Sequence, residues 1–148
     1  MAKKFSFKLE SVLKYRADKV NQAIDALNQV VKLRIEKEKK INELIQLKKE
    51  IYSQGKNKVK ASDLQTKNNY LNSLDEEISK LENEKKQIIE IENIRRIKLT
   101  EAMKDEKVIE KLKEKKISSY KEEIRKEEGI FLDEIGIKGI EKNKENND

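Results

Sequence analysis

The sequence predicts an all-α protein in which two long helices form an antiparallel coiled-coil hairpin, followed by a flexible C-terminal tail. The chain of 148 residues has no proline and only four glycines, three of them in its last twenty residues. Such a chain cannot supply the many turns of a sandwich, a barrel or an α/β fold. Charged residues make up 43% of it, which excludes a deep core because Lys and Glu are rarely buried. Apolar residues recur with the 3.5-residue period of a coiled-coil seam.

The first predicted helix covers about residues 5–53. Its seam positions advance in alternating steps of four and three, and charged side chains at some of them weaken the seam while fixing its register. A second apolar row beside the seam widens the stripe. The seam positions are Leu9, Leu13, Arg16, Val20, Ala23, Leu27, Val30, Arg34, Lys37, Ile41, Leu44, Lys48 and Ile51, and the flanking row is Val12, Ile24, Val31, Ile35 and Ile45.

The bend is expected at about residues 54–60, where Gly55 and Asn57 tolerate the left-handed backbone that ends a helix. A short connection between two strongly periodic helices indicates an antiparallel hairpin.

The second predicted helix covers about residues 61–128. Its seam reads Leu64, Lys67, Leu71, Leu74, Ile78, Leu81, Lys85, Ile88, Glu92, Arg95, Leu99, Ala102, Glu106 and Ile109. At about 1.5 Å per helical residue, pairing with the first helix uses up the second only to about residue 108. We therefore expect the later residues to overhang or to pack on another chain; they are Leu112, Ile117, Tyr120 and Ile124.

The tail, residues 129–148, differs in composition from both helices. An apolar cluster broken by Gly136 and Gly139 is followed by a polar end that is typical of disorder. We expect a flexible segment of the chain, and a short docking element that orders on a partner is the open alternative.

Residue types that are missing from the sequence exclude much chemistry. Without His or Cys, the chain has no zinc site of the usual kinds, no thiol nucleophile and no Ser-His triad. A glycine-rich phosphate loop cannot be written around the lone Gly55. Adjacent carboxylates such as Glu122 and Glu123 are expected to be solvated charges. We predict a non-enzyme with no cofactor, no metal and no small-molecule substrate.

Charge and hydropathy narrow the partners and the location. The net charge is +6, and the basic excess falls in residues 1–60. The densest basic window, residues 32–40, is interrupted by glutamates, and no recognition helix or aromatic platform accompanies it. We therefore expect no nucleic-acid binding. The start of the chain has no apolar signal region, and no apolar run is long enough to span a membrane, so we expect a cytoplasmic protein.

The opening of the chain carries a motif. Its residues follow the pattern F-x-F-x-L-x-x-V-L-x-x-R, with small and apolar residues spaced after it. The residues are Phe5, Phe7, Leu9, Val12, Leu13 and Arg16, then Ala23 and Leu27. This opening resembles the start of the flagellar FliJ family. The chain length, the two-helix layout, a loop just before residue 60 and the sequence Leu132-Asp133-Glu134 agree with that family.

The resemblance implies a component of the flagellar type III protein-export apparatus that has no catalysis of its own. Members of this family form a long antiparallel coiled coil similar to the central stalk of rotary ATPases. They insert into the hexameric ring of the export ATPase, promote its assembly and activity, contact the export-gate membrane protein and help to recycle export chaperones. The expected place is the cytoplasmic face of the inner membrane at the flagellar base.

Two groups of residues are expected to bind these partners. The ATPase end comprises Phe5, Phe7, Leu9, Val12, Leu13, Tyr15 and Arg16, and the gate end comprises Leu47, Ile51, Tyr52, Tyr70 and Leu74. Each group also has a purely structural explanation. Phe5 and Phe7 can staple the helix start onto the partner helix, and the leucines of the gate end can be seam residues beside half-exposed tyrosines.

Two alternative functions remain open from the sequence. A stalk protein of a virulence type III secretion system would share this architecture. A generic cytoplasmic coiled-coil scaffold would show the same periodicity, but we expect it to form a homodimer, whereas a stalk would be a monomeric hairpin.

Overall fold

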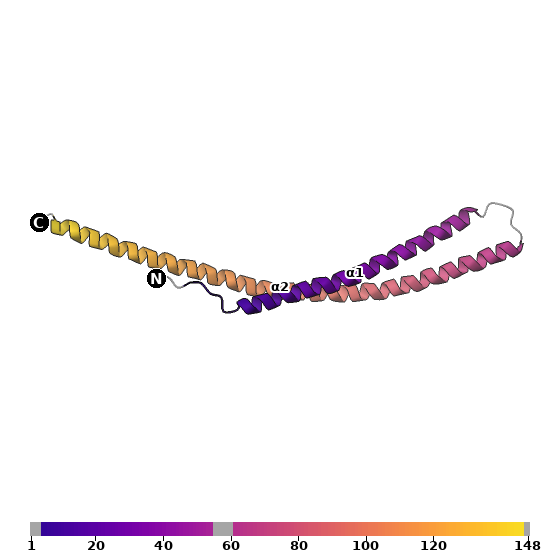
Figure 1. The fold of residues 1–148 in the computed structure, drawn as a ribbon, viewed down its shortest axis with the longest axis horizontal. Coiled ribbons are helices and arrows are strands. Elements are labelled where there is room, and N and C mark those ends of the chain that lie inside the picture. Colours follow the sequence, from indigo (N-terminus) through magenta and orange to yellow (C-terminus); the bar gives the residue numbers. More distant parts are fainter. Residues whose placement is uncertain (1–3, 55–60, 147–148) are drawn as a thin grey trace. The chain divides into compact units, whose positions relative to one another are not determined.

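The computed structural model describes residues 4–54 and 61–146, with side chains up to residue 143. These residues form two α-helices, α1 (Glu10–Ser53) and α2 (Ala61–Asn146), and no strand (Figure 1). The all-α class with two long paired helices is confirmed. Gly55 and Asn57, on which the predicted bend depends, lie outside the described residues.

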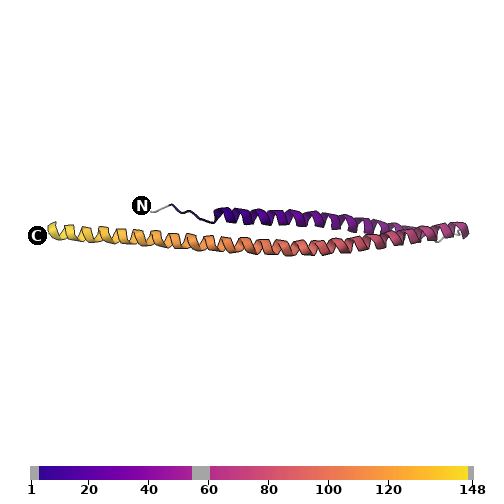
Figure 2. The same ribbon diagram turned by 90° about the horizontal axis from the view of Figure 1, so that it is seen from below.

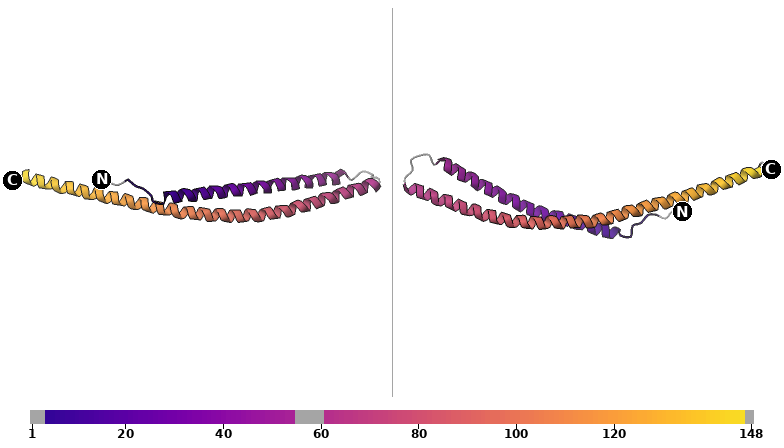
Figure 3. Two further views of the ribbon diagram at one scale, coloured as in Figure 1. Left: turned by 60° about the horizontal axis from the view of Figure 1, so that its bottom comes forward. Right: turned by 180° about the vertical axis from the view of Figure 1, so that it is seen from behind.

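The chain divides into two compact units, and the helices are antiparallel within each. Unit 1 comprises Met1–Asp18 and Met103–Asp148, and unit 2 comprises Lys19–Ala102. In unit 2, Lys48 pairs with Asp75 and Arg34 pairs with Glu92, so a step back along α1 is a step forward along α2 (Figure 3). Unit 1 shows the same sense in the pairs Arg16–Asp105 and Glu10–Lys113.

The predicted seam positions are those that the helix pairing covers. Every predicted seam residue of the first helix is buried or half-buried, and so is every one of the second except Leu64. Leu64 lies in the first turn of α2 and is 50% exposed. The alternating steps of four and three therefore identify the contact line between α1 and α2.

The apolar core is thin. Among the described residues, the buried hydrophobic side chains all lie in unit 2 and are Val30, Ile41, Leu71, Leu74 and Leu81. The flanking row widens the contact less than expected, since Ile35 remains 53% exposed and Ile24 38% exposed. Two helices cover only a narrow stripe of each other, so residues one position away from the seam remain partly in water.

The start of the chain differs from the prediction, because α1 begins at Glu10 and not near residue 5. Residues 4–7 have no regular structure, and residues 8–9 form a turn in which the Glu10 amide donates to the Phe7 carbonyl at 3.2 Å. Phe5, Phe7 and Leu9 are half-buried while the residues between them are exposed. Apolar residues at every second position favour an extended segment over a helix, and Figure 2 shows this segment beside the later part of α2.

The end of the chain also differs in secondary structure, because α2 continues past residue 128 to Asn146. Gly129, Gly136 and Gly139 lie inside the helix, where each costs only about 1 kcal/mol relative to Ala, and no proline interrupts it. The large apolar side chains here are more than half exposed, as Phe131 at 61% and Leu132 at 65% illustrate. No tertiary packing within the described chain covers them, and the flexibility of this tail in solution remains a prediction.

Candidate interaction surfaces of the two units

The N-terminal segment of unit 1 packs its aromatic side chains on α2. The ring of Phe5 lies 5.4 Å from that of Tyr120, centroid to centroid, with the two planes tilted by 49°. This geometry is among those that aromatic pairs favour. The contact joins the chain start to a turn of α2 that lies far away in the sequence, as the structural explanation of Phe5 requires. Binding of the ATPase by Phe5 stays a prediction.

A groove of about 520 Å³ lies along this contact. Its apolar lining residues include Phe7, Leu9 and Leu112, and its charged ones include Lys8 and Lys116. We call this the N-terminal groove. Its apolar residues form what we call the floor, and its charged residues, the two lysines and Glu123, form the wall.

The expected overhang of α2 is thus partly covered by the same chain. Leu112 and Tyr120 line the groove together with residues 5–9, whereas we expected them to be unpaired or to meet another chain. The reason is the extended conformation of the N-terminal segment. Extended residues advance about 3.3 Å each against about 1.5 Å in a helix, so the segment reaches further along α2 than helical turns would.

Ion pairs fix the first turns of α1 against α2. The Arg16 guanidinium lies 3.3 Å from the Asp105 carboxylate, and the Lys113 ammonium lies 2.9 Å from Glu10. Arg16 is a seam residue, and its guanidinium pairs with a carboxylate of the same chain. Tyr15 is 55% exposed, which makes it the most accessible aromatic side chain of the predicted ATPase end.

The predicted gate-end residues divide into covered and accessible ones. Leu74 is only 4% exposed, and Leu47 and Ile51 are half-buried, as seam leucines and their neighbours should be. Tyr52 is 58% exposed and Tyr70 is 48% exposed. The two tyrosines are therefore the side chains of this group that a partner can reach.

Ion pairs on either side of the seam define two flanks of unit 2. Lys37 lies 2.7 Å from Glu84, and Glu38 lies 3.8 Å from Lys85. Consecutive helical residues point about 100° apart, so these two pairs straddle the contact line. We call the side of Glu38 and Lys85 the network flank and the side of Lys37 and Glu84 the opposite flank.

The two exposed tyrosines lie on different flanks. Tyr52 is two heptads from Glu38, which places it on the network flank, where the Lys48 ammonium lies 5.8 Å from its ring centroid. Tyr70 is two heptads from Glu84, on the opposite flank. A partner that contacts both tyrosines must therefore reach around this end of unit 2.

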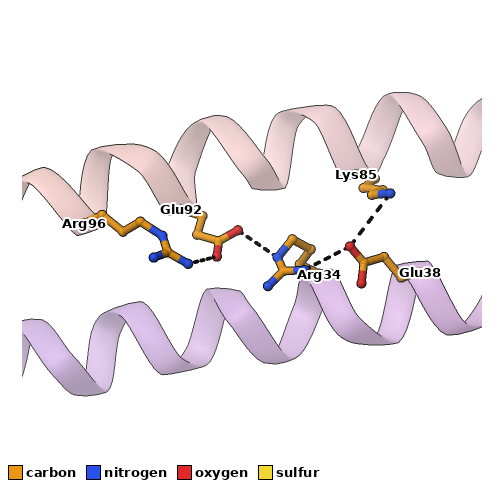
Figure 4. A network of polar contacts seen from close by, with 5 residues as sticks. All are labelled: Arg34, Glu38, Lys85, Glu92 and Arg96. Atoms are coloured by element: carbon orange, nitrogen blue, oxygen red, sulfur yellow. Dashed lines mark hydrogen bonds and ion pairs between the residues drawn. The ribbon is translucent and has the colours of Figure 1, made fainter.

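Charged side chains in the seam and on the network flank beside it form a continuous network (Figure 4). Glu92, whose side chain is only 6% exposed, accepts hydrogen bonds from Arg34 Nε and from Arg96, both at 2.8 Å. Arg34 also donates to Glu38 at 2.9 Å, and Lys85 approaches Glu38. The charges alternate in sign along this line, so each buried group has an opposite charge beside it.

The network shifts the ionisation of its members. The hydrogen bond from Arg96, together with Arg34, lowers the pKa of Glu92 below its ordinary 4.5, despite burial. The hydrogen bond from Lys37 likewise lowers the pKa of Glu84. Glu106, a seam residue of unit 1, is the opposite case, because burial and then the neighbouring Glu110 raise its pKa.

Two kinds of site residue were not predicted from the sequence. Tyr120 and Lys116 line the N-terminal groove, although neither belongs to the predicted ATPase end. The alternation of Phe5, Phe7 and Leu9 would have signalled an extended segment, and the position of its end would then have pointed to α2 beyond residue 110. The seam network could not be predicted from the sequence pattern, since Glu92 was expected only as one of the seam positions.

Two antiparallel helices with exposed aromatic side chains and a charged seam define a coiled-coil interaction protein. Neither helix contains, in the part that the structure describes, a stretch that is long and apolar enough to cross a membrane. A comparison with protein families shows the family to which this coiled-coil chain belongs. The family model described as the flagellar FliJ protein matches residues 5–145.

The chain therefore belongs to the FliJ family, as its opening motif suggested. This family is a non-catalytic one that serves the flagellar protein-export apparatus in stalk and chaperone-related roles. No curated protein and no solved structure matches the chain.

Proposed function

We propose that this chain is the stalk of the flagellar export ATPase. It binds within the ATPase hexamer, promotes the assembly and activity of the ring, and links the ring to the export gate and to export chaperones. Its place is the cytoplasmic face of the inner membrane at the flagellar base. The observation that carries this proposal, beside the family match, is the antiparallel two-helix pairing within each unit.

The pairing suits the inside of a ring. A helix with its side chains is about 10–12 Å in diameter, so a pair of helices is about 20 Å across and can occupy a channel between six subunits. A single asymmetric pair would meet the six subunits differently, so one copy would serve one hexamer. The aromatic residues of unit 1, with Tyr15 exposed on α1 and Phe7 in the lining of the N-terminal groove, support assigning this unit to the ATPase.

The test is ATP hydrolysis by the purified flagellar export ATPase, titrated with the full chain. We expect stimulation that saturates near one copy per hexamer. Tyr15→Ala should weaken this stimulation, whereas Tyr70→Ala, which removes an equally exposed tyrosine from unit 2, should leave it unchanged. Absence of both stimulation and co-elution, with a chain that is helical by circular dichroism, would remove the ATPase from the proposal.

The export gate is assigned to unit 2 on the exposure of Tyr52 and Tyr70. The matched measurement is binding to the cytoplasmic domain of the export-gate protein. Here Tyr70→Ala should weaken binding and Tyr15→Ala should not. Both variants should keep the helicity of the parent. A large fall in melting temperature for Tyr70→Ala would instead assign that side chain to packing within the hairpin.

A generic scaffold is the remaining alternative from another class. Light scattering separates the two, since a scaffold would have twice the 17.4 kDa of one chain and a stalk hairpin would have that mass. The family match favours the flagellar apparatus over a virulence secretion system. Binding to a virulence ATPase but not to the flagellar one would reverse that choice.

A further inference from the structure

The surface around the N-terminal groove has an excess of basic residues. Residues 4–16 and 111–123, which contain the whole lining of the groove, carry nine basic and four acidic side chains. Two of the basic groups are neutralised within the unit, since Arg16 pairs with Asp105 and Lys113 pairs with Glu10. The remaining lysines are all exposed, and they are Lys4, Lys8, Lys14, Lys111, Lys115, Lys116 and Lys121.

Two of these lysines line the groove, and the others lie near its lining residues in the sequence. Lys8 and Lys116 stand in its wall, and Lys111 and Lys115 directly precede the lining residues Leu112 and Lys116. Within the described part of the chain, no ion pair neutralises them. Glu123 is the acidic residue of the lining. A cluster of uncompensated like charges costs self-repulsion, and an oppositely charged partner would relieve that cost.

We infer that this basic groove binds an acidic protein segment that also presents apolar side chains, and that the segment belongs to the export ATPase. The inference rests on the proposed function for the identity of the partner. The apolar floor formed by Phe7, Leu9 and Leu112 takes the apolar side chains, and the lysines in and beside the wall pair with the carboxylates. Charge complementarity selects this occupant, because an apolar groove with a neutral rim would not discriminate between partners.

The chemistry of the groove sets the character of the binding. The lysines are exposed and not buried, so their pairs with carboxylates would be screened by salt and would act mostly on the rate of association and on orientation. The apolar floor would supply the part of the affinity that persists at high salt. Binding to the ATPase should therefore be strongly but incompletely salt-dependent.

The experiment measures the affinity of the full chain for the purified export ATPase hexamer at about 50 mM and about 300 mM salt, between which the screening length falls about 2.5-fold. Three variants accompany the parent chain. Lys8→Glu/Lys116→Glu reverses two charges in the groove wall. Lys8→Arg/Lys116→Arg keeps both charges. The matched control, Lys32→Glu/Lys86→Glu, makes the same charge change at two exposed lysines of unit 2.

We expect the groove reversal to weaken binding about tenfold or more at the lower salt, and less at the higher salt, because rim charges act through screened attraction. The arginine variant and the control should stay within about twofold of the parent. Helicity should be the same in all four chains, since the reversed lysines are exposed. A tenfold loss in the control as well would mean that net charge alone decides, which would overturn the assignment to the groove.

Two other outcomes would also overturn the inference, and they differ from failure of the proposed function. If the parent binds the ATPase but neither salt nor the groove reversal changes its affinity, the groove is not the contact while the stalk proposal stands. If the reversal abolishes binding to vesicles of anionic phospholipid and leaves ATPase binding intact, the groove is a lipid-binding surface. If the parent does not bind the ATPase at either salt, the proposed function itself fails.

Discussion

Replacing Glu92 tests whether the seam network holds unit 2 together. Glu92→Leu removes a carboxylate that accepts hydrogen bonds from Arg34 and Arg96, both at 2.8 Å. The substitution leaves the Arg34 guanidinium, 24% exposed, in an apolar seam with Glu38 as its remaining partner. Because a buried ion pair stabilises less than the cost of leaving one member alone, the single substitution should be destabilising although it adds an apolar residue to the seam.

The magnitude follows from the two bonds. A hydrogen bond to a charged group contributes about 1.5–3 kcal/mol, and Glu92 is almost fully buried, so the bond to Arg34 falls in that range. The bond from Arg96 contributes little, because the Arg96 side chain is 58% exposed and exposed pairs four residues apart are worth about 0.3–0.5 kcal/mol. The new leucine recovers part of the loss by burial. The difference between these contributions leaves an expected cost of about 1 kcal/mol in the free energy of unfolding for Glu92→Leu.

Urea unfolding followed by circular dichroism measures this cost. A second variant tests whether the cost comes from the unpaired charge of Arg34. Arg34→Leu/Glu92→Leu replaces both charges with apolar side chains and should restore most of the lost stability, since no unpaired charge remains in the seam. If Glu92→Leu alone is as stable as the parent, or the double variant is less stable than the single one, the network does not stabilise unit 2 in the way argued.

Three further predictions concern packing, pH and the N-terminal segment. Ile41→Ala should cost about 2–3 kcal/mol because Ile41 is 3% exposed, whereas Ile35→Ala, at a side chain 53% exposed on the same helix, should cost under about 0.5 kcal/mol; urea unfolding compares them. Burial raises the pKa of Glu106, so ionisation of this carboxyl destabilises the folded state at pH values above its ordinary pKa of 4.5. Glu106→Gln should therefore raise the melting temperature at neutral pH but not at pH values below about 4. An equal rise at both pH values would contradict this reasoning. Phe5→Ala removes the ring contact with Tyr120 and should speed proteolysis of the N-terminal segment while leaving the helicity unchanged; unaltered cleavage would show that the contact does not hold the segment.

Much of the fold could be predicted from the sequence because a two-helix protein has one dominant physical constraint. Each helix must turn its apolar residues toward the other, so the 3.5-residue period identifies the seam directly. Val30 and Ile41 are buried where the period puts them, and Leu71 and Leu81 match them on α2. No competing element draws a side chain away from this line among the described residues.

The start of the first helix and the end of the second were predicted less well, because the seam period does not determine where a helix begins or ends. The first helix was predicted to begin at about residue 5, although Phe5 and Phe7 follow the two-residue period of an extended segment. Conversely, the second helix was predicted to end at about residue 128, although a glycine at the next position costs only about 1 kcal/mol within a run of helix-forming residues. A glycine ends a helix when its neighbours favour another conformation, and here they do not.

The candidate sites were predicted in part for a related reason. Exposure follows from the seam, so the accessibility of Tyr15 and Tyr52 could be expected from their positions beside it. The groove at the chain start could not, because it depends on which turn of α2 the extended segment reaches. Lys116 can be assigned to the same surface as Lys8 only after that contact is known.

The charges in the seam also explain why the helices of unit 2 pair in one register. In the observed register, Arg34 meets Glu92, Lys37 meets Glu84 and Lys48 meets Asp75. An apolar seam with a seven-residue period would tolerate a slip of one heptad. The slip in one direction would set Arg34 against Lys85, a like charge, and the slip in the other would set it against Leu99.

The penalty falls on Arg34 in both slipped registers, since Glu92 is the residue that matches it. We therefore expect Arg34→Leu/Glu92→Leu to keep its stability but to lose part of its register specificity, as polar seam residues often trade one for the other. The chain has no cysteine, so Lys48→Cys/Asp75→Cys can report the register through a short bismaleimide cross-linker, which, unlike a disulfide, does not require the two Cα atoms to lie within about 7 Å. The cross-link should form readily with Arg34 and Glu92 present and in lower yield in the leucine background. Equal yields would mean that the apolar seam and the connection between the helices already fix the register without these charges.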